Sequence, residues 1–292
     1  MEKLIVVVGP TSSGKTELAI QLAKLVEGEI VSADSRQVYK GMDLGTGKVT
    51  KKEMQGIPHH LLDVVSPKRT FTVQQYQKLA KKVITDILKR GKIPLLVGGS
   101  PQYIYSVVDN WELPQVKPDR KLREKLERQS VEQLFAKLQK LDPERAATIE
   151  SKNKRRLIRA LEIIAQTGKP VPRLKKSPLP YLVVILGIKR SPEEVKKRIK
   201  KRFEKRLKQG MIQEVKNLRK QGLSWQRLES FGLEYRYIAQ HLQGKLSKEE
   251  MKQQTLKAHE DFTRRQMNWF KKDRRIKWIA GLKDVQATLG II

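Results

Sequence analysis

The segment Leu4–Thr16, with the sequence LIVVVGPTSSGKT, decides the fold of this chain of 292 residues. Its first five residues, Leu4–Val8, form a continuous apolar run of the kind that is buried on both faces in a parallel sheet. The next eight residues, Gly9–Thr16, match the pattern G-x-x-x-x-G-K-[ST], and leucines at helical spacing follow them. A strand, a glycine-rich loop and a helix in this order are the context that a phosphate-binding loop, or P-loop, requires.

The P-loop predicts a site for phosphate or pyrophosphate and leaves open whether a nucleotide such as ATP binds there. Its glycines let backbone N–H groups point at an anion, and the following helix adds the partial positive charge of its N-terminus. Lys15 is expected to neutralise the terminal phosphate, and the Thr16 hydroxyl is expected to hold Mg²⁺. The residues predicted to line this site are Gly9, Pro10, Thr11, Ser12, Ser13, Gly14, Lys15 and Thr16, with Thr16 as the metal ligand.

Strands and helices alternate along the rest of the N-terminal region. A capping box of Thr72 and Gln75 opens a helix that is predicted to run to Lys89. Apolar runs predict further strands at residues 29–33, 93–97 and 181–188. The alternation predicts an α/β fold, namely a P-loop NTPase-like parallel sheet core flanked by helices.

A different pattern begins after Trp111. Prolines interrupt the chain there, and apolar residues then recur with a period near 3.6 up to about Thr167. A second proline-rich stretch precedes the strand at 181–188. We therefore predict a P-loop α/β core with basic C-terminal helices, formed by residues 1–111 and 181–292, and a helical insertion domain at residues 112–180.

Two polar residues come directly after predicted strands of the core. Asp34 follows the second strand and suits either a metal ligand or a general base. Ser35 comes next in place of a second acidic residue, which argues against a motor ATPase. Ser100 follows Gly98-Gly99 at another strand end, where ligands bind in doubly wound sheets. Its hydroxyl either reaches the reacting group or belongs to a simple turn.

The net charge points to a polyanionic partner. Lys and Arg number 62 and Asp and Glu 31, so the formal charge is +31, of which residues 1–110 carry +6, 111–180 carry +9 and 181–292 carry +16. Nucleic acid is the partner that best rewards so many cations, because each phosphate contact releases counterions. The chain has no cysteine, which excludes disulfides and thiol catalysis, and shows neither a membrane-spanning run nor a signal peptide. A cytoplasmic, monomeric protein is expected.

Together these residues resemble one family, the tRNA dimethylallyltransferases, also called tRNA isopentenyltransferases. The matching segments occur in order along nearly the whole chain, and the stretch that begins at Asp34 is more specific than the P-loop. The segments that carry the resemblance are Gly9–Thr16, Asp34–Lys48, His59–Asp63, Ile93–Ser100, Arg155–Glu162 and Arg264–Phe270.

The resemblance implies transfer of a dimethylallyl group from dimethylallyl pyrophosphate to N6 of adenine 37 in the tRNA anticodon stem-loop, giving N6-isopentenyladenosine. Asp34 matches the family's general base, which acts on a flipped adenine, and the P-loop with Mg²⁺ stabilises the pyrophosphate leaving group. The residues implied in catalysis are Asp34, Lys15, Thr16 and Ser100. Those implied in tRNA binding are Asp34, Ser35, Arg36, Gln37, Ser100, Arg123, Arg155, Arg156, Leu157, Ile158 and Arg159.

Two positions depart from the family pattern. Ser100 stands where relatives usually have threonine, and it keeps the hydroxyl. The segment Phe231–Arg236 contains an additional Leu-Glu where relatives have Gly-Tyr followed by Arg or Lys.

The remaining basic and aromatic residues have plainer interpretations. Nine of the thirteen residues 196–208 are Lys or Arg, and Arg198, Arg202 and Arg206 form a stripe that faces RNA or solvent. Trp269 and Trp278 have rings suited to stacking on bases, but we expect them in the core. The adjacent His59 and His60 are expected to be structural.

Two other functions remain open from the sequence. A small-molecule P-loop kinase explains the P-loop and Asp34 but leaves the charge of +31 unexplained. A non-catalytic or ATPase RNA-binding module explains the charge but gives no reason for the sequence Asp34-Ser-Arg-Gln37.

Overall fold

The computed structural model describes residues 2–290 of the chain. The chain divides into two compact units. The first, here called the core unit, consists of Met1–Asn110 together with Pro178–Ile292, and the second, the insertion unit, is Trp111–Ser177. The predicted insertion had its limits at 112 and 180, within a few residues of these.

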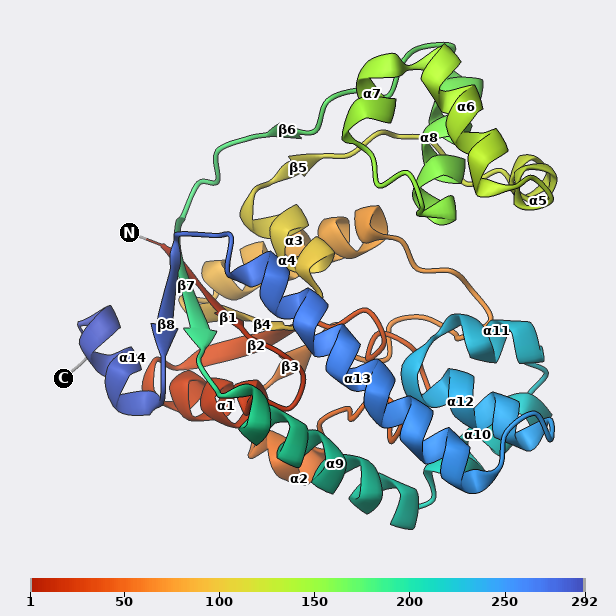
Figure 1. The fold of residues 1–292 in the computed structure, drawn as a ribbon. Helices are drawn as coiled ribbons and strands as arrows, with labels where there is room; N and C mark the ends of the chain where they lie inside the picture. The colour runs from red at the N-terminus through yellow and green to blue at the C-terminus, as the bar shows by residue number, and fades with distance from the viewer. Residues whose placement is uncertain (1, 291–292) are drawn as a thin grey trace. The chain divides into compact units, whose positions relative to one another are not determined.

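A parallel sheet forms the centre of the core unit and confirms the predicted α/β fold (Figure 1). Within residues 2–290 this sheet has six strands in the order β3-β2-β4-β1-β7-β8, and every neighbouring pair is parallel. Four strands, β1, β2, β4 and β7, lie close to the predicted positions, and the apolar runs of β1, β2 and β4 are buried almost throughout. The short strands β3 and β8 were not predicted. The strands are β1 (Lys3–Val8), β2 (Gly28–Ala33), β3 (His59–His60), β4 (Ile93–Gly98), β7 (Leu182–Ile188) and β8 (Ile276–Ile279).

Helices pack around the sheet, and several begin at side-chain caps visible in the sequence. The hydroxyl of Thr72 accepts from the Gln75 backbone N–H at 3.2 Å and opens α3, as predicted. Ser191 with Glu194 opens α9 in the same way. The helices are α1 (Lys15–Leu25), α2 (Lys51–Met54), α3 (Val73–Lys89), α4 (Pro101–Val108), α9 (Pro192–Lys208), α10 (Met211–Lys220), α11 (Trp225–Ser230), α12 (Leu233–Leu242), α13 (Lys248–Phe270) and α14 (Leu282–Leu289).

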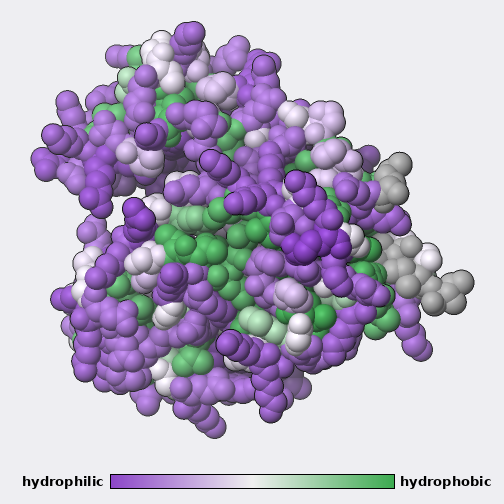
Figure 2. Space-filling model, turned by 180° about the vertical axis from the view of Figure 1, so that it is seen from behind, coloured by the Kyte–Doolittle hydropathy of each residue, from purple (hydrophilic) through white to green (hydrophobic). Residues whose placement is uncertain are grey.

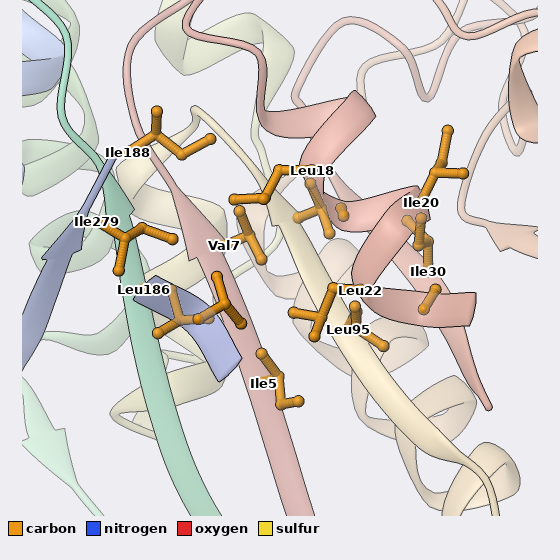
Figure 3. Close-up of a cluster of buried hydrophobic side chains, with 14 residues drawn as sticks. Ile5, Val7, Leu18, Ile20, Leu22, Ile30, Leu95, Leu186, Ile188 and Ile279 are labelled. Carbon is orange, nitrogen blue, oxygen red and sulfur yellow. The ribbon is translucent and has the colours of Figure 1, made fainter. Parts of the chain in front are cut away.

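The helix α1 is fixed to the sheet by a cluster of buried apolar side chains (Figure 3). Leu18 and Leu22 of α1 belong to this cluster with Val7 of β1 and Leu95 of β4. Each fully buried leucine contributes roughly 2 kcal/mol of hydrophobic free energy. The packing therefore holds the N-terminus of α1, where the P-loop ends, at a defined place above the sheet.

The insertion unit has its own small core. Its apolar residues Leu126, Leu134, Leu138 and Leu157 are buried together. Two short strands near its ends pair antiparallel, with Trp111 opposite Lys176. The elements are β5 (Trp111–Glu112), α5 (Arg120–Glu127), α6 (Val131–Leu141), α7 (Pro143–Thr148), α8 (Lys154–Thr167) and β6 (Lys175–Lys176).

The prediction that Trp269 and Trp278 lie in the core is wrong, because they are 42% and 36% exposed. Trp269 lies in the last turn of α13, where one side of its ring faces Tyr105 with 6.2 Å between ring centroids. Trp278 lies on the edge strand β8, where its ring covers Gly187 of the neighbouring strand. Each indole is thus packed on one side only.

Hydrophilic side chains cover most of the face shown in Figure 2, as the abundance of Lys and Arg predicts. Among the helices formed by residues 2–290, none combines the length and the apolar character needed to cross a bilayer.

Candidate active site

The P-loop joins the end of β1 to the start of α1. Gly9 and Gly14 have φ angles of 151° and 98°, values that favour glycine. No side chain caps the N-terminus of α1. The Ser13 hydroxyl is fully buried and has no hydrogen-bond partner within residues 2–290. An uncapped helix N-terminus and an unsatisfied hydroxyl fit the oxygen atoms of a phosphate group.

Lys15 lies within the P-loop, where its ammonium group donates to the Pro10 carbonyl oxygen at 2.7 Å. Burial lowers the pKa of Lys15 to about 7, Asp34 opposes that shift and Arg202 adds to it. The charged form of Lys15 therefore lacks a sufficient counter-charge in the protein itself. A bound polyanion would supply that counter-charge.

The loop after β2 holds the Asp34 carboxylate in one orientation. Its Oδ1 atom accepts from the backbone N–H groups of Arg36 at 2.8 Å and Gln37 at 3.3 Å. The Oγ atom of Ser100 accepts from the Ser35 backbone N–H at 3.0 Å, so the hydroxyl proton of Ser100 remains to be donated elsewhere. Ser100 therefore does more than stabilise its own turn, because this hydrogen bond connects the loop after β4 to the loop that carries Asp34.

Strand register brings these loops to the same edge of the sheet. Gly98 of β4 lies opposite both Val8 of β1 and Ala33 of β2. A Cβ atom on Gly98 would lie only 2.1 Å from the Ala33 carbonyl oxygen, so this close approach requires glycine. The P-loop starts one residue after Val8, Asp34 follows Ala33, and Ser100 lies two residues after Gly98. Because these three strand ends are aligned, the P-loop lies beside the loop that carries the Asp34 carboxylate.

A side chain from α13 joins this edge, and sequence reasoning did not single it out. Gln266 is 3% exposed, and its Oε1 atom accepts from the Thr11 backbone N–H at 2.9 Å. Its Nε2 atom donates to the Gly99 carbonyl oxygen at 2.6 Å. The amide thereby bridges the P-loop and the loop that carries Ser100.

The arginine stripe of α9 faces the P-loop, whereas the sequence predicted that it faces RNA or solvent. Arg202 donates to the Ser12 hydroxyl at 3.2 Å, and Arg206 donates to the Leu44 carbonyl oxygen at 2.8 Å. Arg198 and Arg190 line a cavity of about 190 Å³ beside Ser13 and Gly14. Part of the positive charge of the C-terminal region therefore concentrates at the phosphate site.

Comparison with known proteins agrees with this geometry. The family model described as IPP transferase matches residues 37–273. The chain belongs to the IPP transferase family. The match is to IPP transferases and not to a kinase family, so it disfavours the kinase alternative.

Individual members of the family resemble the chain over most of its length. It is 40% identical over 281 residues to the tRNA dimethylallyltransferase of Anoxybacillus flavithermus, covering 95% of this chain and 90% of that protein. It is 43% identical over 280 residues to that of Corynebacterium diphtheriae, covering 94% and 93%.

Solved structures of the family also share the fold. The tRNA isopentenylpyrophosphate transferase of Bacillus halodurans has a TM-score of 0.71 at 37% identity, covering 96% of this chain and 90% of that one. A eukaryotic dimethylallyltransferase acting on tRNA has a TM-score of 0.79 at 27% identity, covering 99% and 76%.

The segment Phe231–Arg236 of this IPP transferase, which departs from the usual family pattern, anchors the Asp34 loop. Arg36 donates from Nε to the Phe231 carbonyl oxygen at 2.7 Å. The Phe231 ring lies 4.4 Å from the Arg227 guanidinium and 5.9 Å from that of Arg36, measured to the ring centroid. Arg36 and Gln37 therefore both make contacts that hold their own loop, and their predicted contacts with tRNA stay predictions.

Glu234, in the same segment, is a buried carboxylate that pairs with two basic side chains. It is 2% exposed, and its Oε1 atom lies 2.8 Å from Arg206 Nη2 and 2.9 Å from His259 Nε2. Burial alone would raise the pKa of Glu234, but His259 and Arg206 outweigh burial and bring it to about 2. The ion pair with Glu234 restrains Arg206, which lies one helical turn from Arg202 on the arginine stripe of α9.

Replacing Glu234 with glutamine (Glu234→Gln) is expected to lower the free energy of unfolding at pH 7 by about 3 kcal/mol, because it removes the counter-charge of the mostly buried Arg206 guanidinium. The folded pKa is below the unfolded value of 4.5, so the contribution of Glu234 is present above pH 4.5 and is lost as the pH falls toward 2. Urea denaturation at pH 7 and pH 3 should show a smaller difference from wild type at pH 3. The matched control is Glu249→Gln, whose side chain is 68% exposed. Equal stabilities of wild type and Glu234→Gln at pH 7 would contradict the assignment.

In the insertion unit, two of the predicted tRNA contacts surround a buried carboxylate. Glu162 has no exposed surface and accepts from Arg123 Nε and Nη2, both at 2.6 Å, and from Arg159 Nη1 at 2.5 Å. Burial raises the pKa of Glu162, and the hydrogen bonds from the two arginines outweigh it, so the pKa is lowered overall. Arg123 and Arg159 therefore have a structural role in this unit, whatever they contact outside it.

Leu157 and Ile158, which were predicted among the tRNA-binding residues, do not present their side chains to a partner. These side chains are 0% and 4% exposed and belong to the apolar core of the insertion unit. They face inward because they alternate with the basic residues at the helical period of α8. Arg155 and Arg156 are exposed on the other face of α8, where a polyanion can reach them.

The site fits Mg²⁺ chiefly through its P-loop. Thr16, in the first turn of α1, has an exposed side chain. No cluster of three or more His, Asp or Glu side chains able to hold a metal occurs in the described part of the chain. Mg²⁺ commonly binds through few protein ligands together with phosphate oxygens, and Thr16 suits that arrangement.

His59 and His60 lie on the edge strand β3. His59 contacts the Ile57 carbonyl oxygen and His60 contacts Glu29, in agreement with a structural role.

Proposed function

We propose that this chain transfers a dimethylallyl group from dimethylallyl pyrophosphate to N6 of adenine 37 in the tRNA anticodon loop, giving N6-isopentenyladenosine. The observation that carries the proposal is the placement of the Asp34 carboxylate beside a P-loop at aligned strand ends. The curated relatives named tRNA dimethylallyltransferase support it. A carboxylate beside a P-loop can accept the proton of an amine nucleophile, and the names of these relatives favour adenine N6 over a hydroxyl or water.

The P-loop acts on the leaving group. The bond between the allylic carbon and the pyrophosphate oxygen breaks, and the electron pair leaves with pyrophosphate. Backbone N–H groups at the start of α1, the Lys15 ammonium and the guanidinium of Arg202 stabilise the charge that develops there. Mg²⁺, held by the Thr16 hydroxyl together with pyrophosphate oxygens, would neutralise further negative charge.

Asp34 acts on the nucleophile. The N6 lone pair is delocalised into the adenine ring, so the amine needs a base to accept its proton as the new carbon–nitrogen bond forms. The backbone N–H groups of Arg36 and Gln37 fix the Asp34 carboxylate for this purpose. The target base has to leave its stack to reach a sheet edge, so we infer that adenine 37 is flipped out of the anticodon loop.

We also infer that the enzyme works as a monomer in the cytoplasm. All the residues assigned to the pyrophosphate and to the base belong to the core unit of one chain. A tRNA substrate is found where translation occurs, which is consistent with this location.

The direct test is incubation of the protein with Mg²⁺, dimethylallyl pyrophosphate and unmodified tRNA, followed by digestion and mass spectrometry of the nucleosides. We expect N6-isopentenyladenosine, and none with a matched tRNA that has guanine at position 37, because guanine lacks the N6 amine. Absence of the product together with ATP-dependent phosphorylation of a small metabolite would favour a kinase instead.

The insertion unit permits a test of its proposed tRNA contacts. Arg155→Ala is expected to weaken tRNA binding by roughly fivefold and to reduce the slope of log K against log salt by about 1, with an unchanged melting temperature. Arg123→Ala should instead lower the free energy of unfolding by about 3 kcal/mol, because Glu162 loses its bidentate partner. Fluorescence anisotropy between 50 and 200 mM salt, roughly the range over which counterion effects are large, measures the slope. An unchanged slope for Arg155→Ala would remove that residue from the interface.

A further inference from the structure

Gln266 of α13 is the buried polar side chain that connects the two halves of the candidate active site. On one side, its Oε1 atom accepts from both the backbone N–H and the hydroxyl of Thr11, at 2.9 and 3.3 Å. On the other side, its Nε2 atom donates to the Gly99 carbonyl oxygen at 2.6 Å. Thr11 lies in the loop that takes the leaving group, and Gly99 precedes Ser100.

The contact with Gly99 continues to the base. Ser100 accepts from the Ser35 backbone N–H at 3.0 Å, and Ser35 directly follows Asp34. A short path of hydrogen bonds therefore runs from the P-loop through the Gln266 amide to the Asp34 loop. Gln266 lies 255 residues from Thr11 in the sequence, so α13 supplies a connection that neither loop can make alone.

We propose that Gln266 is a positioning residue that sets the distance between the pyrophosphate site and Asp34. This inference rests on the proposed transferase function and adds a residue that contacts neither the pyrophosphate nor the adenine. The planar amide carries one acceptor and one donor in opposite directions, and each faces a backbone group of the complementary kind. An isosteric carboxylate would keep the acceptor for Thr11 but place an oxygen against the Gly99 carbonyl.

The chemical consequence concerns which nucleophile captures the allylic carbon. In the wild-type enzyme N6 attacks, its proton passes to Asp34 and pyrophosphate leaves. If the two loops are no longer held together, water can attack the same carbon as pyrophosphate leaves, giving dimethylallyl alcohol and a proton. Reacting groups displaced by about 1 Å lose roughly 100-fold in rate, whereas each separate binding site can remain intact.

The test measures this partition in the purified full-length enzyme with Mg²⁺, tRNA and labelled dimethylallyl pyrophosphate. For Gln266→Glu and Gln266→Met we expect kcat for transfer to fall roughly 10- to 100-fold. The ratio of dimethylallyl alcohol to prenylated adenosine should rise at least roughly tenfold on the same reasoning. The dissociation constants of inorganic pyrophosphate and tRNA should change less than about threefold. The matched control is Gln254→Met, an exposed glutamine of the same helix, which should behave as wild type.

A second variant leaves Gln266 in place. A Cβ atom on Gly99 would lie 2.5 Å from Gln266 Nε2, so Gly99→Ala should push the amide away and raise the same ratio. A loss of transfer in which this ratio stays at the wild-type value in all three variants would overturn the proposal and leave Gln266 a structural residue. If instead wild type makes no prenylated adenosine, the proposed function itself fails, so the two failures are distinguishable.

Discussion

Asp34→Asn is expected to reduce transfer to adenine about 1,000-fold, because an amide cannot accept the N6 proton and a general base contributes roughly 100- to 10,000-fold. The side-chain oxygen of asparagine can still accept from the backbone N–H groups of Arg36 and Gln37, so the loop should keep its conformation. Single-turnover transfer with saturating tRNA gives the rate, and a filter-binding assay gives the affinity for tRNA, which should stay within about twofold of wild type.

Asp86→Asn is the matched control for this variant, since Asp86 lies on α3 with a side chain that is 64% exposed. It should transfer the dimethylallyl group at the wild-type rate. An Asp34→Asn enzyme that also reached the wild-type rate would show that another group takes the proton.

The second large effect concerns Lys15. Lys15→Met is expected to reduce transfer by about 100- to 1,000-fold, because it removes a charge that stabilises the departing pyrophosphate. In the ligand-free protein burial lowers the pKa of Lys15 to about 7, so the side chain is mostly neutral at pH 8. A bound polyanion favours the ammonium form and raises that pKa again, so binding at pH 8 should be accompanied by proton uptake at Lys15.

Isothermal titration of inorganic pyrophosphate in two buffers with different ionisation enthalpies measures this uptake. Pyrophosphate can itself exchange protons with the buffer, so the informative quantity is the difference between wild type and Lys15→Met. We expect wild type to take up nearly one proton more per bound pyrophosphate at pH 8, and the difference to vanish near pH 6, where Lys15 is already charged. Equal uptake by the two proteins at pH 8 would show that Lys15 does not bind the anion.

The parts of the fold that were predictable are those with local signals. The run Leu4–Val8 and the P-loop lie next to each other in the chain, and capping boxes such as Thr72 with Gln75 involve residues three positions apart. These features need no knowledge of tertiary contacts. The position of Asp34 after an apolar run was sufficient to place it at the sheet edge, because parallel strands end together.

The rest of the site depends on contacts between residues far apart in the sequence. Nothing near Gln266 indicates that its amide meets Thr11, and the arginine stripe of α9 has the same helical spacing whether it faces RNA, solvent or the P-loop. By contrast, the burial of Leu157 and Ile158 had a visible signal. Both continue the apolar face of α8, and the acidic Glu162 interrupts that face at the place where two arginines meet it.

The junction between the two units has a consequence for chain entropy. On the core side, Asn110 donates from Nδ2 to the Pro178 carbonyl oxygen at 3.1 Å, so the two ends of the core at which the insertion departs already meet. On the insertion side, β5 and β6 close the same gap by pairing. The two chain segments that lead into and out of the insertion are therefore held together, so the insertion costs the core about as much closure entropy as a short loop would. The hydrogen bond and the strand pair described above offset that entropy. Such an arrangement lets the length and sequence of the insertion change over evolution with little cost to the folding of the catalytic core.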